Sequence, residues 1–486
     1  MSLPARYLPP VNRCLTHLDK QLFLKKIPLV VVSFPDPRNI SVFTSRFKED
    51  ILRIPRICHV VPLESTTAIT AAQEPPLKKK TLANDNHIRK GILLKDSVHK
   101  VEDVKTELSQ EAQDFLQETK ASIENFNYTI DYDFYKAEEI FNAILPEHLL
   151  HEVPSGFTVT GHIAHLNLRA EFKPLGEIIG QVILDKNSQI KTVVDKVDSI
   201  ANKFRTFQMK LLAGEEDFNV TIHESNCTFN FDFRNVYWNS RLHTEHNRLV
   251  TLFKPHQLVC DVFAGVGPFA LPAAKKQVFV LANDLNPHSY ESMINNIKTN
   301  KVGSFVNPSN LDGREFIAQS PMLLESWLEQ TNGKVIIPGG KKYKLAADGT
   351  TVRTPPKNIT LPRFVHHYVM NLPDSAITFL NEFVGLYSRH GYSKSTLEER
   401  YPDFELPWIH CHCFLKYSPE ERPEPSIEEQ HNRVYRQVLD VMEATEKELP
   451  RDAFQFHLVR KVAPTKPMFC VSFRLPASIA FKEKTN

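Results

Sequence analysis

The chain has 486 residues, of which 42% are hydrophobic, so it can bury two or three cores and is predicted to form that many domains. Its 59 Lys and Arg against 57 Asp and Glu leave a net charge of +2, which excludes a globally basic nucleic-acid-binding protein and restricts such contacts to local patches. The seven cysteines are odd in number and form no CxxC pair, which excludes a disulfide framework and a zinc ribbon and predicts a reducing compartment.

The N-terminal region, residues 1–100, is predicted to fold as a domain. Its longest apolar run, Ile27–Phe34, is far shorter than the roughly 18 residues that cross a bilayer, so no membrane span is predicted. The first thirty residues contain five basic side chains and one acid, which fits a mitochondrial targeting signal. The segment LPPVNRCLTHLDKQLF also has the pattern of folded structure, and we favour this second interpretation. Residues 64–90 are predicted to be a disordered loop, in which PPLKKK fits either a nuclear signal or, as we favour, a solvated run.

Residues 101–126 are predicted to be a linker helix, and residues 127–228 a middle α/β domain. The helix rests on the charged, weakly amphipathic pattern that follows Ser97. Four segments of the middle region are rich in the β-branched and aromatic residues that favour strands: FTVTGHIAHLNL, VVDKV, FQMKLLAG and NVTIHESNCTFNFDF.

From residue 229 to residue 486 strand and helix patterns alternate, which predicts an α/β fold with a Rossmann-like, doubly wound parallel sheet. The predicted strands are LVCDVF, VFVLAND, HHYVMNL and WIHCHCFLKY, and helices are expected from Pro268 and over 288–299, 375–388 and 426–447. FQFHLVRKV and MFCVSFRL are predicted to close the sheet as an antiparallel hairpin. Residues 331–358 are rich in Gly, Pro and basic side chains and are predicted to be a loop insertion, either a spacer or an arm that faces RNA.

A glycine-rich turn follows the first of these strands. In LVCDVFAGVGPFA the strand leads to Gly265 and Gly267, which let the backbone approach a ligand closely, and Pro268 fixes φ for the start of a helix. On its own the Gly-x-Gly-x-x-Ala spacing also fits a dinucleotide-binding fingerprint.

Carboxylates near this turn narrow the choice of ligand. Asp261 lies four residues before Gly265, where it can receive the ammonium group of a methionine moiety but would repel a pyrophosphate, so it favours S-adenosylmethionine over NAD. Asp284 follows 23 residues later at the end of the next strand and can bond to ribose hydroxyls. Asp312 is predicted either to contact adenine, with Gly313 allowing close approach, or to cap a helix.

Two later segments carry further polar groups. Asn371-Leu-Pro-Asp374 ends the fourth strand and either offers a rigidly held amide to a nitrogen-bearing ring, as in many enzymes that methylate nitrogen in bases, or forms a plain turn. His410–Cys413 contains four residues of metal-binding type, but alternate residues of a strand face opposite ways, so the four ligands cannot converge and no metal site is predicted.

In this order the motifs resemble the eukaryotic and archaeal tRNA methyltransferases that form N1-methylguanosine at tRNA position 37, beside the anticodon. The resemblance runs from about Leu8 to Pro476. Its motifs are LPPVNR, TGHIAHLNLR, FRTFQMKLLAGE, VYWNSRLHTEHNRL, DVFAGVGPFA, ANDLNP, YVMNLPDSA and HLVRKVAPTKPMFC. Ser240 stands where many relatives have proline, which affects the stiffness of a loop more than the assignment.

The resemblance implies a class I methyltransferase domain behind two smaller α+β domains, the first of which recognises tRNA. It also implies methyl transfer from S-adenosylmethionine to guanine N1, which needs a base for the N1 proton and a cation for charge that develops on O6. By the matched motifs Glu245 is implied as the base, Arg205 as the O6 stabiliser, and Asn371 with Pro373 as the holder of the ring. Without the family, Glu245 would be interpreted as a helix cap and Arg205 as part of a surface ion pair.

The same match implies contacts with the cofactor and with RNA. The implied cofactor contacts are His246, Leu285 and Asn371, beside Asp261, Gly265, Gly267, Asp284, Asp312 and Gly313. A lone histidine on a helix such as His246 more often has a structural role. The target base must leave its stack, so phosphate contacts are expected. The candidates are Arg169, Arg460, Lys461 and Lys466, basic residues beside strands that would otherwise be solvated.

Three alternatives stay open. The related enzyme of wybutosine synthesis transfers an aminocarboxypropyl group from the same cofactor but generally lacks the Asn-Leu-Pro segment. An RNA-binding protein with a cofactor-free Rossmann-like domain is opposed by the retained glycines and acids, and an NAD-dependent oxidoreductase is opposed by Asp261. We expect a monomer without membrane contact in the cytoplasm, with the mitochondrial matrix and the nucleus as alternatives.

Overall fold

The computed structural model describes residues 3–13, 15–63, 89–154, 156–197, 204, 206–337, 343–345, 351–353, 356–421 and 423–483. The chain forms two compact units. The first consists of Met1–Phe157, Leu168–Val193 and Leu212–Gly214, and the second of Thr158–Asn167, Val194–Leu211 and Glu215–Asn486. Among the described residues no helix is both long and apolar enough to span a membrane.

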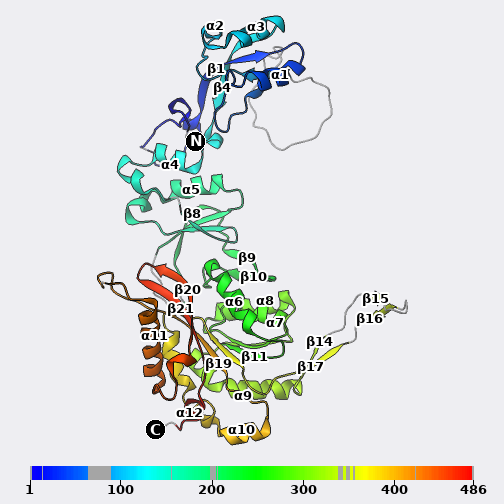
Figure 1. The fold of residues 1–486 in the computed structure, drawn as a ribbon, viewed down its shortest axis with the longest axis vertical. Helices are drawn as coiled ribbons and strands as arrows, with labels where there is room; N and C mark the ends of the chain where they lie inside the picture. The colour runs from blue at the N-terminus through cyan, green and yellow to red at the C-terminus, as the bar shows by residue number, and fades with distance from the viewer. Residues whose placement is uncertain are drawn as a thin grey trace. The chain divides into compact units, whose positions relative to one another are not determined.

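The first unit contains a four-stranded antiparallel sheet with the order β2-β3-β1-β4, of which β1 and β4 are labelled in Figure 1. Its strands are β1 Lys25–Ser33, β2 Val60–Leu63, β3 Arg89–Leu93 and β4 Ser122–Ile130. The helices α1 (Arg38–Arg46) and α3 (Gln110–Glu118) share one apolar core with this sheet. The run at Ile27–Phe34 is therefore a core strand, whose apolar side chains are buried on both faces.

The N-terminal segment is folded, as we expected, at the residues that the structure describes. Short 3-10 helices span Ala5–Tyr7 and Lys20–Phe23, and the Tyr7 side chain is fully buried and donates a hydrogen bond to Asp96. Residues 64–88 of the predicted disordered loop lie outside the described residues, whereas its last two residues begin β3.

The predicted linker helix over 101–126 is wrong in its second half. The helices α2 (Val104–Glu107) and α3 occupy its first part, but β4 begins at Ser122 and pairs with β1 along its whole length. The sequence SIENFNYTI alternates apolar and polar residues, which favours a strand once a partner is present. The predicted domain boundaries at residues 100 and 228 stay predictions.

The middle region has the mixed α/β structure that its composition predicted. Its helices are α4 Ala137–Ile144 and α5 Gly176–Lys186, with 3-10 helices at Tyr132–Phe134, Glu147–Glu152 and Ala170–Leu175. Its sheet has the order β5-β6-β7-β8, formed by Thr158–Thr160, Ile163–Leu166, Thr192–Lys196 and Met209–Gly214. The hairpin of β9 (Asn219–Glu224) and β10 (Cys227–Asp232) belongs to the second unit.

A seven-stranded sheet with the order β13-β12-β11-β18-β19-β21-β20 is the centre of the second unit (Figure 1). The first five strands in that order are parallel, and β21 and β20 are antiparallel, as the predicted closing hairpin requires. In chain order they are β11 Leu258–Asp261, β12 Phe279–Asn283, β13 Val306–Ser309, β18 His367–Met370, β19 Trp408–Phe414, β20 Gln455–Ala463 and β21 Lys466–Arg474. The predicted doubly wound sheet is confirmed.

The helices of this unit follow its strands. They are α6 His243–Leu252, α7 Ala270–Lys275, α8 Pro287–Asn300, α9 Gly313–Thr331, α10 Lys394–Arg400, α11 Ile427–Met442 and α12 Ala477–Ala480. The helix expected over 375–388 is instead a 3-10 helix, Ala376–Phe383, which packs between α9 and α11. Further 3-10 helices span Ser240–Leu242, Ser388–His390 and Arg451–Ala453.

The predicted loop insertion over 331–358 contains strands where the structure describes it. β14 (Lys334–Ile337) pairs with β17 (Lys357–Thr360), and β15 (Tyr343–Leu345) pairs with β16 (Thr351–Arg353). Val335 and Ile359 are buried in the core of the second unit and hold the base of the first pair. These scattered apolar residues among Gly and Lys were too few to predict a hairpin.

Candidate active site

The glycine turn connects β11 to α7 at the carboxyl edge of the parallel strands. Gly265 and Gly267 both have positive φ, +55° and +99°. A Cβ on Gly265 would meet nothing within 4 Å, so its backbone borders open space that a ligand can enter. A Cβ on Gly267 would lie 2.1 Å from Cδ1 of Leu271, so a side chain here would have to displace Leu271 and would also be strained by the φ of +99°.

Asp284 ties the turn to the second strand. Its Oδ2 accepts a hydrogen bond from the Gly265 N–H at 2.8 Å, and its Oδ1 accepts one from the Asn286 N–H at 2.9 Å. Burial raises its pKa, although these two amides act against that rise. Each carboxylate oxygen keeps a free lone pair, so the predicted bonds to ribose hydroxyls remain available.

Asp261 ends β11 and is fully buried, and neither carboxylate oxygen has a hydrogen-bond partner of ordinary geometry. Burial and the neighbouring Asp284 raise its pKa to about 8, although His412 and the Phe263 N–H lower it. A buried carboxylate without a partner is costly, and the group that would relieve this cost is a cation with N–H donors. The ammonium group of S-adenosylmethionine fits that requirement.

The acid after the third strand caps a helix. Asp312 is the N-cap of α9 and accepts a hydrogen bond from the Arg314 N–H at 2.9 Å, which confirms the capping alternative. A Cβ on Gly313 would lie 2.7 Å from a ring carbon of Phe263, so packing requires this glycine. The predicted contact of Asp312 with adenine stays a prediction.

Leu285 and His246 are held by neighbours inside the unit. The Leu285 carbonyl accepts a hydrogen bond from the Asn310 side chain at 3.2 Å. Nδ1 of the buried His246 lies 2.6 Å from a carboxylate oxygen of Glu224 on β9, and its ring packs edge-on against Phe269. His246 thus has the structural role weighed for a lone histidine, and its predicted cofactor contact stays a prediction.

Glu245 lies on the first turn of α6 and is only 2% exposed. Arg248 donates two hydrogen bonds to its carboxylate, at 2.6 and 2.7 Å, and His412 Nε2 lies 2.8 Å from its Oε1. Burial would raise the pKa of Glu245, but Arg248 and His412 lower it to about 2. Glu245 therefore does not cap its helix, and it is an ionised carboxylate inside the protein at neutral pH.

Asn371 follows β18, and its side-chain oxygen is buried without a partner. The backbone of this segment is fixed, because the Pro373 carbonyl accepts a hydrogen bond from the Phe414 N–H at 2.8 Å. A rigid segment with an unpartnered amide oxygen fits the predicted holder of a nitrogen-bearing ring better than it fits a plain turn.

The sheet brings three of these polar groups to one edge. β11, β18 and β19 are neighbouring parallel strands in which Asp261 pairs with Val369, and Met370 pairs with Cys411. Asp261, Asn371 and His412 therefore lie at the carboxyl ends of adjacent strands, where ligands bind in open α/β sheets. Arg205 lies outside the described residues.

The predicted RNA contacts are scattered over the chain. Arg169, in the first unit, forms an ion pair with Glu152, and Lys461 on β20 lies 3.6 Å from Glu424. Lys466 extends over the ring of Phe414 at 4.1 Å, and Arg460 is partly exposed on β20. Their roles in RNA binding stay predictions.

Three residues of this site were not predicted from the sequence. Arg248 follows Glu245 at the i, i+3 spacing of facing helical side chains, which could have indicated the pair. Asn283 is buried in β12, where its side chain bonds to the backbone of Val262 and Leu311 and so orders the loops on either side. His412 had no local signal, because its partner Glu245 lies 167 residues away.

One group of potential metal ligands occurs in the described part of the chain. Glu245, His412 and Cys470 have ligand atoms within 4.8 Å of one another. The guanidinium of Arg248 is bound to both oxygens of Glu245, and its positive charge opposes a second cation there. The cluster is therefore a hydrogen-bonded centre rather than a metal site.

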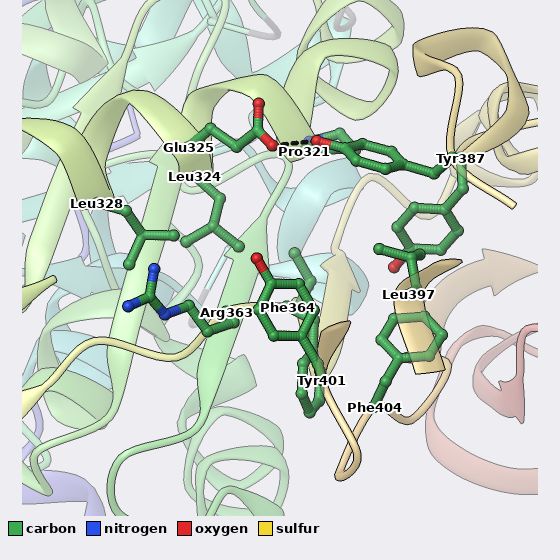
Figure 2. A pocket seen from close by; sticks show the side chains of 12 residues that line it. Pro321, Leu324, Glu325, Leu328, Arg363, Phe364, Tyr387, Leu397, Tyr401 and Phe404 are labelled. Carbon is green, nitrogen blue, oxygen red and sulfur yellow. Dashed lines mark hydrogen bonds between the residues drawn. The ribbon is translucent and has the colours of Figure 1, made fainter. Parts of the chain in front are cut away.

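A separate hollow is lined by residues that include Arg363 and Phe364, which precede β18 in the chain (Figure 2). Leu324, Glu325 and Leu328 of α9 line one side of it, and Tyr401 and Phe404 line another. The Tyr392 hydroxyl donates a hydrogen bond to Glu325, as the dashed line shows. The twelve lining residues include none of the predicted site residues, so this hollow is distinct from the site.

Comparisons with known proteins agree with the geometry. A family model for the TYW2 N-terminal domain matches residues 137–217, and one for the TRM5/TYW2 methyltransferase domain matches residues 221–324. The tRNA (guanine(37)-N(1))-methyltransferase of Saccharomyces cerevisiae is 52% identical over 97% of this chain and 95% of its own length. The chain belongs to the tRNA (guanine(37)-N(1))-methyltransferase family.

Other members of the family and one solved structure extend this result. The enzyme of the same name from Schizosaccharomyces pombe is 43% identical over 97% of this chain and 96% of its own length. A solved complex of aTrm5 and tRNALeu has the same fold, with a TM-score of 0.51 at 16% identity, over 92% of this chain and 99% of that chain. The predicted class I, Rossmann-like fold is confirmed.

Proposed function

We propose that the chain is a tRNA (guanine(37)-N1)-methyltransferase that transfers the methyl group of S-adenosylmethionine to N1 of guanine 37. The observation that carries this conclusion is the 52% identity with the Saccharomyces cerevisiae enzyme of that name over almost the whole of both chains. The fully buried, unpartnered Asp261 beside the glycine turn supports the same cofactor. The aminocarboxypropyl alternative is not favoured by these relatives.

The residues of the turn would hold the cofactor. Asp261 would receive its ammonium group, Asp284 its ribose hydroxyls, and the backbone at Gly265 would lie against it. When bound, S-adenosylmethionine supplies an electrophilic methyl group on a positively charged sulfur. The positive charge close to Asp261 would also favour the ionised form of that carboxyl.

The proton on guanine N1 must leave as the methyl group arrives. Glu245 is ionised in the resting protein and is the proposed acceptor of that proton. We propose that guanine replaces at least one of the two hydrogen bonds that Arg248 donates to this carboxylate. Loss of a cationic partner raises the pKa of a buried carboxylate, so this exchange would strengthen Glu245 as a base when the substrate is present.

Asn371 and Pro373 are the proposed holders of the guanine ring, and Arg205 is the proposed donor to O6. The unpartnered amide oxygen of Asn371 supports this placement, because it can accept from an N–H of the base edge. A base stacked in the anticodon loop would have to flip out of its stack to reach this edge of the sheet. Arg460, Lys461 and Lys466 are proposed to contact phosphates.

Methylation of two unmodified tRNA transcripts tests the function. One transcript carries guanosine at position 37, and the other carries adenosine there. We expect methyl transfer from S-adenosylmethionine to the first alone, with a product nucleoside heavier by one methyl group. Equal activity on both transcripts would contradict the proposed site, and a product heavier by an aminocarboxypropyl group would identify the alternative reaction.

We also propose that the protein is a monomer and works in the cytoplasm. Six described cysteines are free, which agrees with a reducing compartment. Sedimentation of the purified protein measures its oligomeric state. Fractionation of cells that produce the tagged protein distinguishes the cytoplasm from the mitochondrial matrix and the nucleus.

A further inference from the structure

His412 on β19 is the most deeply buried partner of the Glu245 carboxylate. Its side chain is 0% exposed, and its Nε2 lies 2.8 Å from Oε1 of Glu245. Nε2 can donate to that oxygen whether the ring is neutral or charged, because either form can carry a proton there. The contact joins the middle of a strand to the first turn of α6, so both ends are fixed by regular structure.

The other partners of Glu245 are more exposed. The Arg248 side chain is 28% exposed, and the His457 side chain, whose Nε2 lies 3.5 Å from Oε2, is 46% exposed. A base that arrives from solvent can therefore displace Arg248 or His457 but cannot reach the His412 side of the carboxylate. When guanine exchanges with Arg248, the hydrogen bond from His412 is the one that remains.

Several charged or titratable groups surround the His412 ring. They are Glu245 and Arg248 on α6, Cys470 on β21, His457 on β20, His410 on β19 itself and Asp261 on β11. Burial would lower the pKa of His412, but Cys470 and Glu245 outweigh burial and raise it to about 10. A cationic ring beside Glu245 favours the ionised carboxylate.

We infer that His412 is a positioning residue for Glu245, which holds the carboxylate toward the guanine and keeps it ionised after Arg248 is displaced. This inference rests on the proposed role of Glu245 as the base. His412 would touch neither the guanine nor the cofactor, and its effect on the base would pass through Oε1. It follows that loss of His412 should change turnover and its pH dependence but not the binding of tRNA.

The test compares His412→Met, which nearly keeps the volume, and the somewhat larger His412→Phe, both of which remove the donor, with His412→Gln, whose amide can still donate. We expect the Phe and Met variants to lower kcat by about 10- to 100-fold, which is less than the roughly 100- to 10,000-fold that a positioned base contributes. KM for tRNA should stay within about twofold. His412→Gln should recover a large part of the lost activity.

The pH profile provides the second readout. His412 should keep the pKa of Glu245 low in the complex after Arg248 is displaced, so kcat of the native protein should show no acid limb above pH 5. Without the donor, burial is less opposed and the pKa of Glu245 rises, so activity of the Phe and Met variants should fall as the pH is lowered from 7 to 5. A role confined to packing would not move this limb.

His410→Gln is the matched control, because His410 lies on the same strand face, is equally buried and bonds to Ser472 and His367 instead. Full activity of Glu245→Gln would refute the proposed base itself. If Glu245→Gln is inactive while the Phe and Met variants match His410→Gln in kcat and pH profile, the inference on His412 alone is wrong. If the Phe variant does not fold, the Met variant decides, since methionine adapts to irregular packing.

Discussion

Asp261 and Glu245 are both buried carboxylates, and their surroundings move their pKa values in opposite directions. Burial and Asp284 raise the pKa of Asp261 to about 8. Arg248 and His412 lower that of Glu245 to about 2 against the effect of burial. At neutral pH Asp261 of the free protein is therefore mostly protonated, and it would lose its proton when a cation binds beside it. Glu245 is ionised and can accept a proton.

Replacement of Asp261 by Asn should stabilise the ligand-free protein and weaken cofactor binding. A carboxyl whose pKa is raised in the folded state makes the native protein bind more protons than the unfolded chain, so its contribution to stability falls as the pH rises from about 4 to about 8. The gain in Tm for Asp261→Asn should therefore be larger at pH 8 than at pH 5. Loss of the carboxylate should raise the Kd of S-adenosylmethionine at least about tenfold, or 1.4 kcal/mol.

Thermal melts and calorimetry measure these two effects. Asp312→Asn is the control for the thermal melts, because asparagine caps a helix as well as aspartate does. A cofactor Kd unchanged in Asp261→Asn would show that the carboxylate does not receive the ammonium group. If Asp261→Asn raises Tm equally at pH 5 and at pH 8, the stabilisation does not come from the loss of a buried carboxyl whose pKa is raised.

The residue roles of the site were predictable only where the signal is local. Asp261 and Gly265 were found because a strand that ends in an acid before a glycine turn is a contiguous pattern. For Asp312 the sequence allowed a helix cap and a contact with adenine about equally, since both roles use the same position at the start of a helix. The pair of Glu245 and His412 could not be predicted, because its residues meet only after α6 packs on the sheet.

At the scale of the element, the glycine turn combines one position for ligand approach with one for packing. Gly267→Ala should lower the free energy of unfolding by about 1 to 3 kcal/mol, because its Cβ would overlap the Leu271 side chain and its φ of +99° strains an alanine. Gly265→Ala should cost only about 1 kcal/mol, which is the strain of a left-handed alanine. Its methyl group would enter the open space, so Gly265→Ala should instead weaken cofactor binding.

Urea unfolding measures the stability of both variants, and cofactor titration measures their affinity for S-adenosylmethionine. The two substitutions add the same methyl group within one turn, so each serves as the control for the other. Equal losses of stability in both variants would contradict the packing difference. An unchanged Kd in Gly265→Ala would show that the cofactor does not approach this face of the turn.

The sequence predicted best those strands whose side chains are buried along their whole length. β11, β12 and β18 are buried on both faces and have continuous apolar runs, which is the composition of a central parallel strand. β4 was missed because its outer face is polar and its pairing with β1 is a long-range contact. The 3-10 helix Ala376–Phe383 has the apolar spacing of a helix, which does not distinguish the two hydrogen-bonding patterns.

For the whole molecule, the near balance of charges restricts how RNA can bind. With a net charge of only +2, long-range attraction is weak, and affinity must depend on a few phosphate contacts. Lys461→Ala should therefore raise KM for tRNA and leave the Kd of S-adenosylmethionine unchanged. Removal of one phosphate partner should also reduce the slope of log KM against log salt by about 0.7 to 0.9. The ion pair of Lys461 with Glu424 is exposed and contributes little to stability.

Initial rates at several salt concentrations measure that slope. Lys394→Ala is the matched control, because Lys394 has the same exposed fraction, 55%, and a comparable ion pair with Glu398 on α10. The same change of slope in both variants would show that the effect comes from net charge and not from a phosphate bound by Lys461.

The division of the chain into two units has a consequence for its evolution. The second unit takes Thr158–Asn167 and Val194–Leu211 from between segments of the first. A single recombination event joins one upstream sequence to one downstream sequence, so no single crossover can exchange one whole unit without also taking part of the other. We therefore expect the two units to have been inherited together, with new variants arising by substitution and loop insertion and not by shuffling of whole units.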